Sequence, residues 1–243
     1  MQRRKALLAV IALTMLCIGI APVLGAIIKS GDFNESHWQT YTGYADFSSK
    51  GITLVPTYTT NTSKIIYYKT IQELGYNTTK VYLYYKLNDV TWYSESDMDR
   101  TIELWITNGA TEYLIGFNHY NDRYDFRLKV GSNQVYDTLS DFPTEGIIAF
   151  DSATNIATLY ATNGTRITYV QYTGSGSTSP LTSFGFTVFK ATATIQSYAL
   201  ANTLDSVTMA KTTSNVSGAV LAFIPVIVVF AMLGLVLRQI KKF

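Results

Sequence analysis

Apolar and polar residues alternate with a period of two through much of the chain. Residues 81–87, 101–107 and 124–130 show the pattern most clearly, with an apolar residue at every second position and polar or amphipathic residues between them. Successive side chains of a strand point to opposite faces, so this alternation is typical of strands that bury one face. The pattern predicts half-buried antiparallel strands.

Further segments have the same strand character, and short turns separate them. The additional predicted strands are residues 51–59, 64–71, 111–118, 146–151, 156–162, 166–172, 184–190, 195–199 and 206–210. Asn108-Gly109 and Asn163-Gly164 are strong signals for tight turns between strands. No helix is expected in this region. About a dozen strands with short turns predict an all-β antiparallel β-sandwich.

An apolar run stands near each end of the chain, over residues 6–28 and 219–237. The second run contains no charged residue and would reach roughly 28 Å as a helix, which is enough to cross a bilayer. Basic residues in the tail, residues 238–243, place that tail in the cytoplasm by the positive-inside rule. We therefore expect a transmembrane helix over residues 219–237, after a polar stalk over residues 211–218.

The first run has the form of a secretory signal peptide over residues 1–25. Arg3, Arg4 and Lys5 precede it, and the small residues Gly25 and Ala26 follow it. The run could also remain as an uncleaved N-terminal anchor helix, which leaves the topology unchanged. A pilin-like leader is less favoured, because a filament subunit should not carry a second anchor. Residues 26–210 then form an extracellular domain.

Charge and cysteine content exclude several classes of function. Six of the 19 basic residues and none of the 17 acidic residues lie in the two flanks, so the domain between them has 13 basic and 17 acidic residues and a net charge of −4. Nucleic acid binding lacks its basic surface. Cys17, the only cysteine, lies in the first apolar run. The domain therefore has no disulfide and no cysteine-bound zinc, and His37 and His119 lack metal-ligand spacing.

A run of motifs in the centre of the chain resembles a known group of sandwiches. Residues 112–118 (EYLIGFN) and 124–130 are followed by residues 146–151 (GIIAFD), and then by residues 156–160 (IATLY) with Asn163-Gly164-Thr165. This succession resembles the concanavalin A-like and laminin G-like jelly rolls from Trp38 onward. The resemblance implies a jelly-roll sandwich whose first and last strands lie side by side, which would bring residues near Asp46 and near Val207 to the same end. It does not fix a function.

Some members of that superfamily are glucanases, whose catalytic strand reads Glu-x-Asp-x-x-Glu. The nearest match here starts at Glu95 and Asp97 and has Arg100 where the second glutamate belongs. Retaining hydrolysis needs a pair of carboxylates, so one of them is missing. We expect a solvated acidic loop here, no catalytic residues and no enzymatic activity.

Calcium is a candidate ligand, because related jelly rolls often hold it with loop oxygens. The candidate calcium ligands are Asn118, Asn121, Asp122 and Asp125 around one turn, or Asp151 and Asn155 around another. The alternative is ordinary turn chemistry, in which Asn and Asp side chains bond to their own backbone. No other cofactor is expected.

Strand parity also suggests a ligand-binding face. In residues 101–107 the alternation directs Ile102, Leu104 and Ile106 to the core and leaves Glu103 and Trp105 on the other face. The same parity leaves Tyr82 and Tyr84 opposite the core. Aromatic rings beside polar groups suit a carbohydrate, because sugar C–H faces stack on rings while hydroxyls need polar partners. The predicted ligand-binding residues are Trp105, Tyr82, Tyr84 and Glu103. Packing against loops or another subunit is the alternative for these positions.

Five N-glycosylation sequons agree with an extracellular domain. They lie at Asn34, Asn61, Asn77, Asn163 and Asn215. The sequence therefore predicts a membrane-anchored glycoprotein of the cell-surface membrane or of a virion envelope, with a lectin-like domain that recognises carbohydrate or a surface glycoprotein. The alternative is a surface-lattice, pilus-associated or virion coat protein that self-assembles, and a glycoside hydrolase is third. The polar composition with few charges resembles archaeal surface proteins or those of archaeal viruses.

Overall fold

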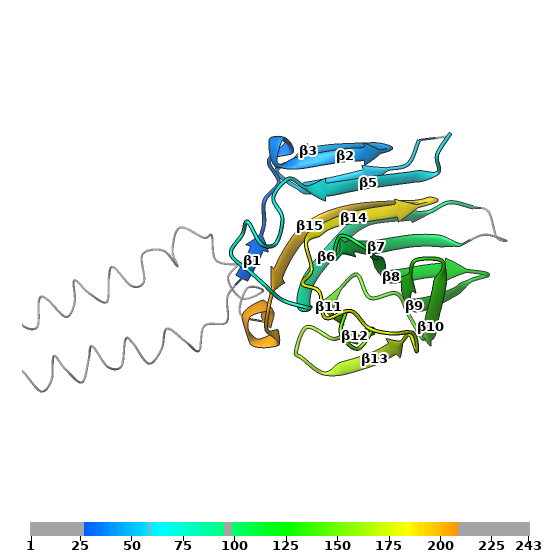
Figure 1. Cartoon of the computed structure of the whole chain (residues 1–243). Coiled ribbons are helices and arrows are strands. Elements are labelled where there is room, and N and C mark those ends of the chain that lie inside the picture. The colour runs from blue at the N-terminus through cyan, green and yellow to red at the C-terminus, as the bar shows by residue number, and fades with distance from the viewer. Residues whose placement is uncertain (1–26, 58, 95–98, 209–243) are drawn as a thin grey trace, which may run out of the picture.

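The computed structural model describes residues 27–57, 59–94 and 99–208, which form two antiparallel β-sheets packed face to face (Figure 1). Sheet A has the strand order β13-β12-β11-β6-β15-β4-β3, with β1 also paired to β15, and sheet B has the order β10-β9-β8-β7-β14-β5-β2. The all-β antiparallel sandwich expected from the sequence is confirmed.

The strands of sheet A are β1 (Ile27–Ser30), β3 (Tyr44–Ser48), β4 (Gly51–Val55), β6 (Lys80–Trp92), β11 (Glu145–Asp151), β12 (Ile156–Tyr160), β13 (Arg166–Gln171) and β15 (Ala191–Ala201). The strands of sheet B are β2 (Trp38–Thr42), β5 (Thr62–Tyr67), β7 (Arg100–Thr107), β8 (Glu112–Tyr120), β9 (Arg123–Val130), β10 (Asn133–Leu139) and β14 (Ser183–Phe189). A short 3-10 helix, η1 (Glu35–His37), precedes β2.

The core lies between the two sheets and is built from the positions that the alternation predicts. In β6 the side chains of Val81, Leu83, Tyr85 and Leu87 face it, and all are less than a tenth exposed. The facing residues of sheet B come from β7, β8, β9 and β14. Since each strand points every second side chain toward the core, both sheets keep a second face outside the core.

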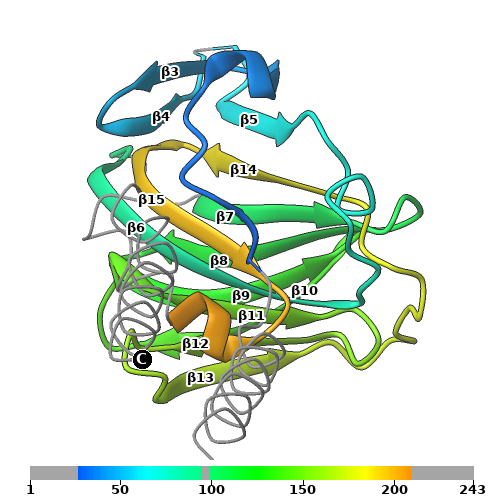
Figure 2. The ribbon, with the colours of Figure 1, turned by 90° about the vertical axis from the view of Figure 1, so that its left-hand side faces the viewer.

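The structure corrects several secondary-structure expectations. Strands β1, β2, β3 and β10 were not expected, and β10 was missed because most of its side chains are polar, with Val135 and Leu139 as its inward apolar contacts. The strand expected over residues 206–210 is wrong for the described part, where residues 204–208 form a helical turn. Figure 2 shows this turn against the outer face of sheet A, and its Val207 packs there with Tyr84 and Ala201.

The expected signal peptide or anchor (residues 1–25), the stalk (211–218), the transmembrane helix (219–237) and the basic tail (238–243) lie outside the described residues. Within the described residues, no helix has the length and apolar character needed to cross a membrane.

The strand that pairs with β15 is β1, which was not expected, whereas Asp46 lies in β3, which pairs with β4 and not with β15. Ile27 of β1 pairs with Ala201 of β15, so the described chain begins and ends at the same end of the sandwich (Figure 1).

The Asp32 carboxylate ties the segment after β1 to sheet B. Its Oδ2 atom lies 2.8 Å from each of Lys29 Nζ, His37 Nδ1 and the Tyr67 hydroxyl, and Trp38 Nε1 donates to the Asp32 carbonyl at 2.8 Å. Burial alone would raise the pKa of Asp32, but these hydrogen bonds outweigh it and hold the pKa well below its usual range.

Because the folded protein holds the proton on Asp32 more weakly than the unfolded chain does, Asp32 stabilises the fold at neutral pH. This contribution is complete above about pH 5 and is lost as the pH falls through about 4 and below. We expect Asp32→Asn to lower the melting temperature at pH 7 and to flatten its decline between pH 5 and 3. The measurement is a series of thermal melts across that range. A decline as steep as that of the unaltered protein would contradict this role.

The core also predicts a contrast between two isoleucines. Ile106 of β7 is 0% exposed and Ile167 of β13 is 48% exposed. We expect Ile106→Ala to destabilise the protein by about 2–5 kcal/mol, because it leaves a cavity, and Ile167→Ala to cost below about 1 kcal/mol. Urea unfolding of the two variants measures the difference. Equal losses of unfolding free energy in the two variants would contradict this assignment of the core.

Candidate functional site

The face of sheet B that points away from the core carries most of the buried polar side chains of this sheet. We call it the outer face of sheet B. It is formed by Lys64 of β5, Thr101, Glu103 and Trp105 of β7, Gly116 and Asn118 of β8, Asp125 and Arg127 of β9, Tyr136 of β10, and Gly185 and Thr187 of β14. Sequence parity placed Glu103 and Trp105 on this face correctly.

A buried ion pair lies at the centre of the outer face. Arg127 Nε donates to Glu103 Oε1 at 2.6 Å, and the two side chains are 8% and 2% exposed. Gly116 pairs with Glu103 on one side and with Arg127 on the other, so the two long side chains meet across a residue that has none. Thr101 Oγ1 donates to the second carboxylate oxygen of Glu103 at 2.9 Å. Both oxygens of Glu103 are thus held.

The Arg127 guanidinium extends this network toward solvent. Its Nη1 atom lies 3.2 Å from Gln134 Oε1 and 3.5 Å from Asp99 Oδ2, and Asn118 Nδ2 donates to Asp99 Oδ1 at 3.1 Å. Burial alone would lower the pKa of Arg127, but the charge and hydrogen bond of Glu103 outweigh it and raise the pKa. The guanidinium therefore stays charged and fixed in direction.

Trp105 lies beside this network, but its ring is covered. The residue is 6% exposed. The Lys64 ammonium lies 4.0 Å from the ring centroid, and Trp105 Nε1 donates to Glu112 Oε1 at 3.1 Å. A ring accessible to a sugar, which the sequence predicts at this position, is not open in this arrangement, because Lys64 crosses over it.

The structure does not bring Tyr82 and Tyr84 together with Trp105 and Glu103. The two tyrosines are on β6, in sheet A, and face away from the core on that sheet. Tyr84 is 3% exposed, and its hydroxyl donates to Glu145 Oε1 at 3.0 Å. The helical turn over residues 204–208 packs there through Val207, so this pair has a packing role. Strand parity could not reveal that β6 and β7 belong to different sheets.

The candidate calcium ligands of the first turn are partly brought together. Asn118 and Asp125 are cross-strand neighbours, and Asn121 and Asp122 are exposed in the β8–β9 turn. Both oxygens of Asp125 are occupied, by hydrogen bonds from Arg123 and Thr138. Across residues 27–57, 59–94 and 99–208, no group of three or more His, Cys, Asp or Glu side chains could hold a metal ion.

The second candidate pair, Asp151 and Asn155, forms hydrogen bonds with the backbone. Asp151 Oδ1 accepts from the Ala153 amide at 3.0 Å, and Asn155 Nδ2 donates to the carbonyls of Gly174 and Ser175 at 3.1 Å. The Asp151 contact is the turn chemistry that the sequence left open as the alternative, whereas Asn155 connects its turn to a distant loop.

Four of the five sequons lie in loops or turns of the described chain. Asn34, Asn77 and Asn163 are exposed, and Asn61 is half-buried. Asn215, Glu95 and Asp97 lie outside the described residues.

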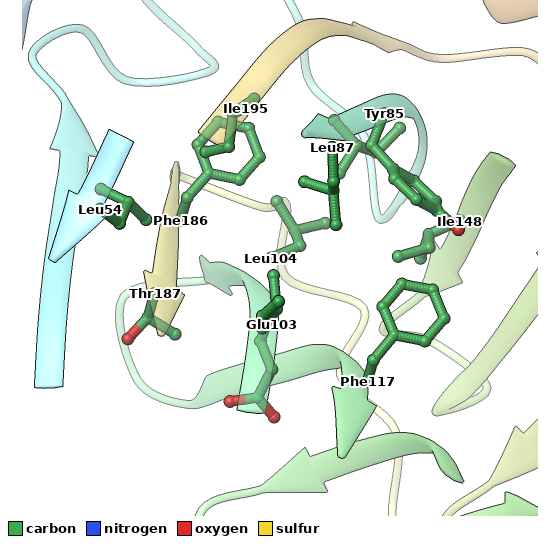
Figure 3. Close-up of a pocket in the computed structure, with 12 residues that line it drawn as sticks. Leu54, Tyr85, Leu87, Glu103, Leu104, Phe117, Ile148, Phe186, Thr187 and Ile195 are labelled. Carbon is green, nitrogen blue, oxygen red and sulfur yellow. The ribbon is translucent and has the colours of Figure 1, made fainter. Parts of the chain in front are cut away.

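A small cavity of about 30 Å³ lies between the sheets and is lined almost entirely by apolar side chains. Figure 3 shows that the polar ends of Glu103 and Thr187 point away from it, toward the outer face of sheet B. A cavity of this size and lining does not admit a sugar. The outer face is therefore the better candidate for ligand contact.

Sequence reasoning missed Arg127 and Lys64. It also missed Gly116 and Gly185, which lie on the strands between the side chains that meet. Alternation in residues 124–130 does place Arg127 opposite the core. Its meeting with Glu103 depends on the order of β7, β8 and β9 in the sheet, which alternation does not give.

No model of a known protein family matches the chain, and no curated protein matches it. Among solved structures, the Crh5 transglycosylase in complex with NAG is similar with a TM-score of 0.49 and 9% identity, over 73% of this chain and 86% of that one. A lectin from Bauhinia forficata in complex with GalNAc has a TM-score of 0.48 and 12% identity, over 72% and 98%. The legume lectin-like domain from Entamoeba histolytica has a TM-score of 0.49 and 11% identity, over 73% of this chain and 98% of that one.

With TM-scores below 0.5, these likenesses assign no ligand and no activity to this chain.

The Glu103–Arg127 pair predicts a non-additive pair of substitutions. Arg127→Met leaves the Glu103 carboxylate buried without its cation, which we expect to cost about 3–5 kcal/mol. The double variant Glu103→Gln/Arg127→Met should be more stable than Arg127→Met alone, because the buried charge is gone. Urea unfolding measures the stability of Arg127→Met and of the double variant, and Arg166→Met, at an exposed arginine, is the matched control. A double variant less stable than either single one would contradict the burial of this pair.

Proposed function

We propose that this protein is a membrane-anchored surface glycoprotein whose sandwich binds carbohydrate through the outer face of sheet B, without catalysis. The observation that carries the proposal is the fixed polar network of Glu103, Arg127 and Asp99 on a sheet face outside the core. Directed donors and acceptors that are already in place bind hydroxyl groups at a low entropic cost.

Aromatic rings stand near both ends of this network. Tyr136 of β10 and Tyr41 of β2 are 55% and 62% exposed. Tyr136 pairs with Arg127 in register, and the Tyr41 ring lies 5.5 Å from the Lys64 ammonium. Exposed rings can stack on the apolar faces of sugars, while the open end of the network, the 41% exposed Asp99 carboxylate, meets the hydroxyls. An extended glycan fits this arrangement better than a single sugar.

The same network argues against hydrolysis. A retaining glycosidase needs a carboxylate that is free to attack and an acid about 5 Å away. The Glu103 side chain is 2% exposed, and both its oxygens accept hydrogen bonds from Arg127 and Thr101. This carboxylate can orient a neighbour, but it is not free to act as a nucleophile.

Membrane anchoring and a position at the cell-surface membrane or in a virion envelope are supported by the two apolar runs of the sequence. The described chain starts at β1 and ends after β15, at one end of the sandwich. Attachment through both flanks at that end would leave the outer face of sheet B accessible.

Self-assembly is the second candidate, and it has its own observation. Ile167 and Tyr169 of β13 are 48% and 51% exposed, and β13 stands at the end of the strand order in sheet A. Exposed apolar side chains on a terminal strand favour contact with another chain.

A glycan array tests the proposal with matched tyrosine variants. We expect the intact protein in detergent to bind glycans, and Tyr41→Ala or Tyr136→Ala to weaken binding by about tenfold or more, because a stacking ring is worth about 1.4 kcal/mol. Tyr169→Ala, an equally exposed ring on sheet A, is the control. Absence of binding by folded protein, or equal losses in all three variants, would refute the proposed face.

A further inference from the structure

Three groups surround the Lys64 ammonium on the outer face of sheet B. Its Nζ atom lies 4.0 Å from the centroid of the Trp105 ring, 5.5 Å from that of Tyr41, and 3.4 Å from Glu112 Oε1. Trp105 Nε1 donates to the same Glu112 oxygen at 3.1 Å, so the indole also fixes the carboxylate. Two aromatic rings and a carboxylate are the groups with which proteins hold ammonium ions.

Strand register explains how Lys64 reaches this position. Lys64 of β5 pairs with Thr187 of β14, and Trp105 of β7 pairs with Gly185, two residues earlier on β14. Gly185 has no side chain to separate them, so the Lys64 stem passes over β14 to the ring. The lysine thus lies over the Trp105 ring, which is only 6% exposed on a face outside the core.

The contacts that retain Lys64 are those that another cation could take over. The Glu112 side chain is 61% exposed, and an ion pair so open to water contributes little. The lysine stem is long and flexible, so it can turn into solvent without moving β5. Trp105 belongs to a strand with neighbours on both sides, and its position does not depend on the lysine.

We propose that Trp105, Tyr41 and Glu112 form a binding site for an ammonium group of the ligand, with Lys64 as its internal competitor. On the carbohydrate-binding face this site selects glycans with free amino groups over their N-acetylated or neutral counterparts. This selectivity rests on the proposed function, whereas the ammonium site itself does not.

The chemistry of exchange favours an amine over a neutral sugar. A neutral ring that displaces Lys64 removes the cation from two aromatic faces and leaves Glu112 without a positive partner. An ammonium group replaces both contacts, so its exchange with Lys64 is nearly balanced. The remaining sugar contacts then decide the affinity.

The test uses the full-length protein in detergent and measures affinity by calorimetry for three probes. These are a β-1,4-linked glucosamine tetramer, the matching N-acetylglucosamine tetramer, and tetramethylammonium. The variants are Lys64→Ala, Lys64→Arg, Lys64→Gln and Glu112→Gln, the last of these made in the Lys64→Ala background. Lys80→Ala is the matched control, because Lys80 lies over the Tyr82 ring at 5.4 Å on the other sheet.

We expect Lys64→Ala to bind the glucosamine tetramer about tenfold more tightly than the unaltered protein, because the competitor is gone. Lys64→Arg, which keeps a cation, and Lys80→Ala should show no such gain. In the Lys64→Ala background, where no lysine competes for the carboxylate, Glu112→Gln should weaken binding of the glucosamine tetramer and leave the N-acetylated tetramer unaffected.

The outcomes separate this inference from the proposed function. If tetramethylammonium binds Lys64→Ala but neither tetramer binds any variant, the ammonium site stands and carbohydrate recognition fails. If both tetramers bind equally well and neither Lys64→Ala nor Glu112→Gln alters their affinity, the ammonium site is refuted while the carbohydrate face stands. If Lys64→Ala does not fold, Lys64→Gln, which also removes the cation, takes its place, and unchanged glucosamine binding in that variant overturns the inference.

Discussion

The structure depends on one constraint, that each of two sheets buries a single face against the other. A strand satisfies this constraint when its side chains alternate between the two faces. Ile102, Leu104 and Ile106 therefore point to the core, while Glu103 and Trp105 point to the outer face. The core then supplies the stability of a domain without disulfides, since the described chain has no cysteine. Every polar feature of the outer face stands on strands whose positions that core fixes.

Two glycines determine what the outer face can do. Gly116 stands between Glu103 and Arg127, and Gly185 stands beside the path of Lys64 to Trp105. A Cβ at either position would lie within 2.3 Å of a carbonyl oxygen of the neighbouring strand, so glycine also allows the close approach of the backbones. Charged side chains that start two strands apart can therefore meet. The result is a buried ion pair at the centre of the face and a covered indole beside it.

These two contacts differ in strength and so in their consequences for recognition. The Glu103–Arg127 pair is almost fully buried, and its removal would leave a charge without solvent, so it behaves as fixed structure. The Lys64–Glu112 pair is exposed at its carboxylate and can open. A rigid polar centre next to an exchangeable cation would give a ligand both a fixed reference and a selective contact. On the outer face of sheet A, by contrast, Tyr84 and Val207 pack together in an apolar cluster.

The sequence by itself determined the fold class, the inward and outward faces of the strongest strands, and the apolar flanks, because a period of two and the length of an apolar run are local properties. It missed β10, whose polar side chains hide a terminal strand, and it predicted a strand where residues 206–208 are helical. Only the tertiary structure decided which side chains of different strands meet. Parity placed Tyr84 and Trp105 opposite the core alike, yet β6 and β7 belong to different sheets, and the pairing of Arg127 with Glu103 required the order of strands. Strand order depends on contacts between residues distant in sequence, which no local pattern records.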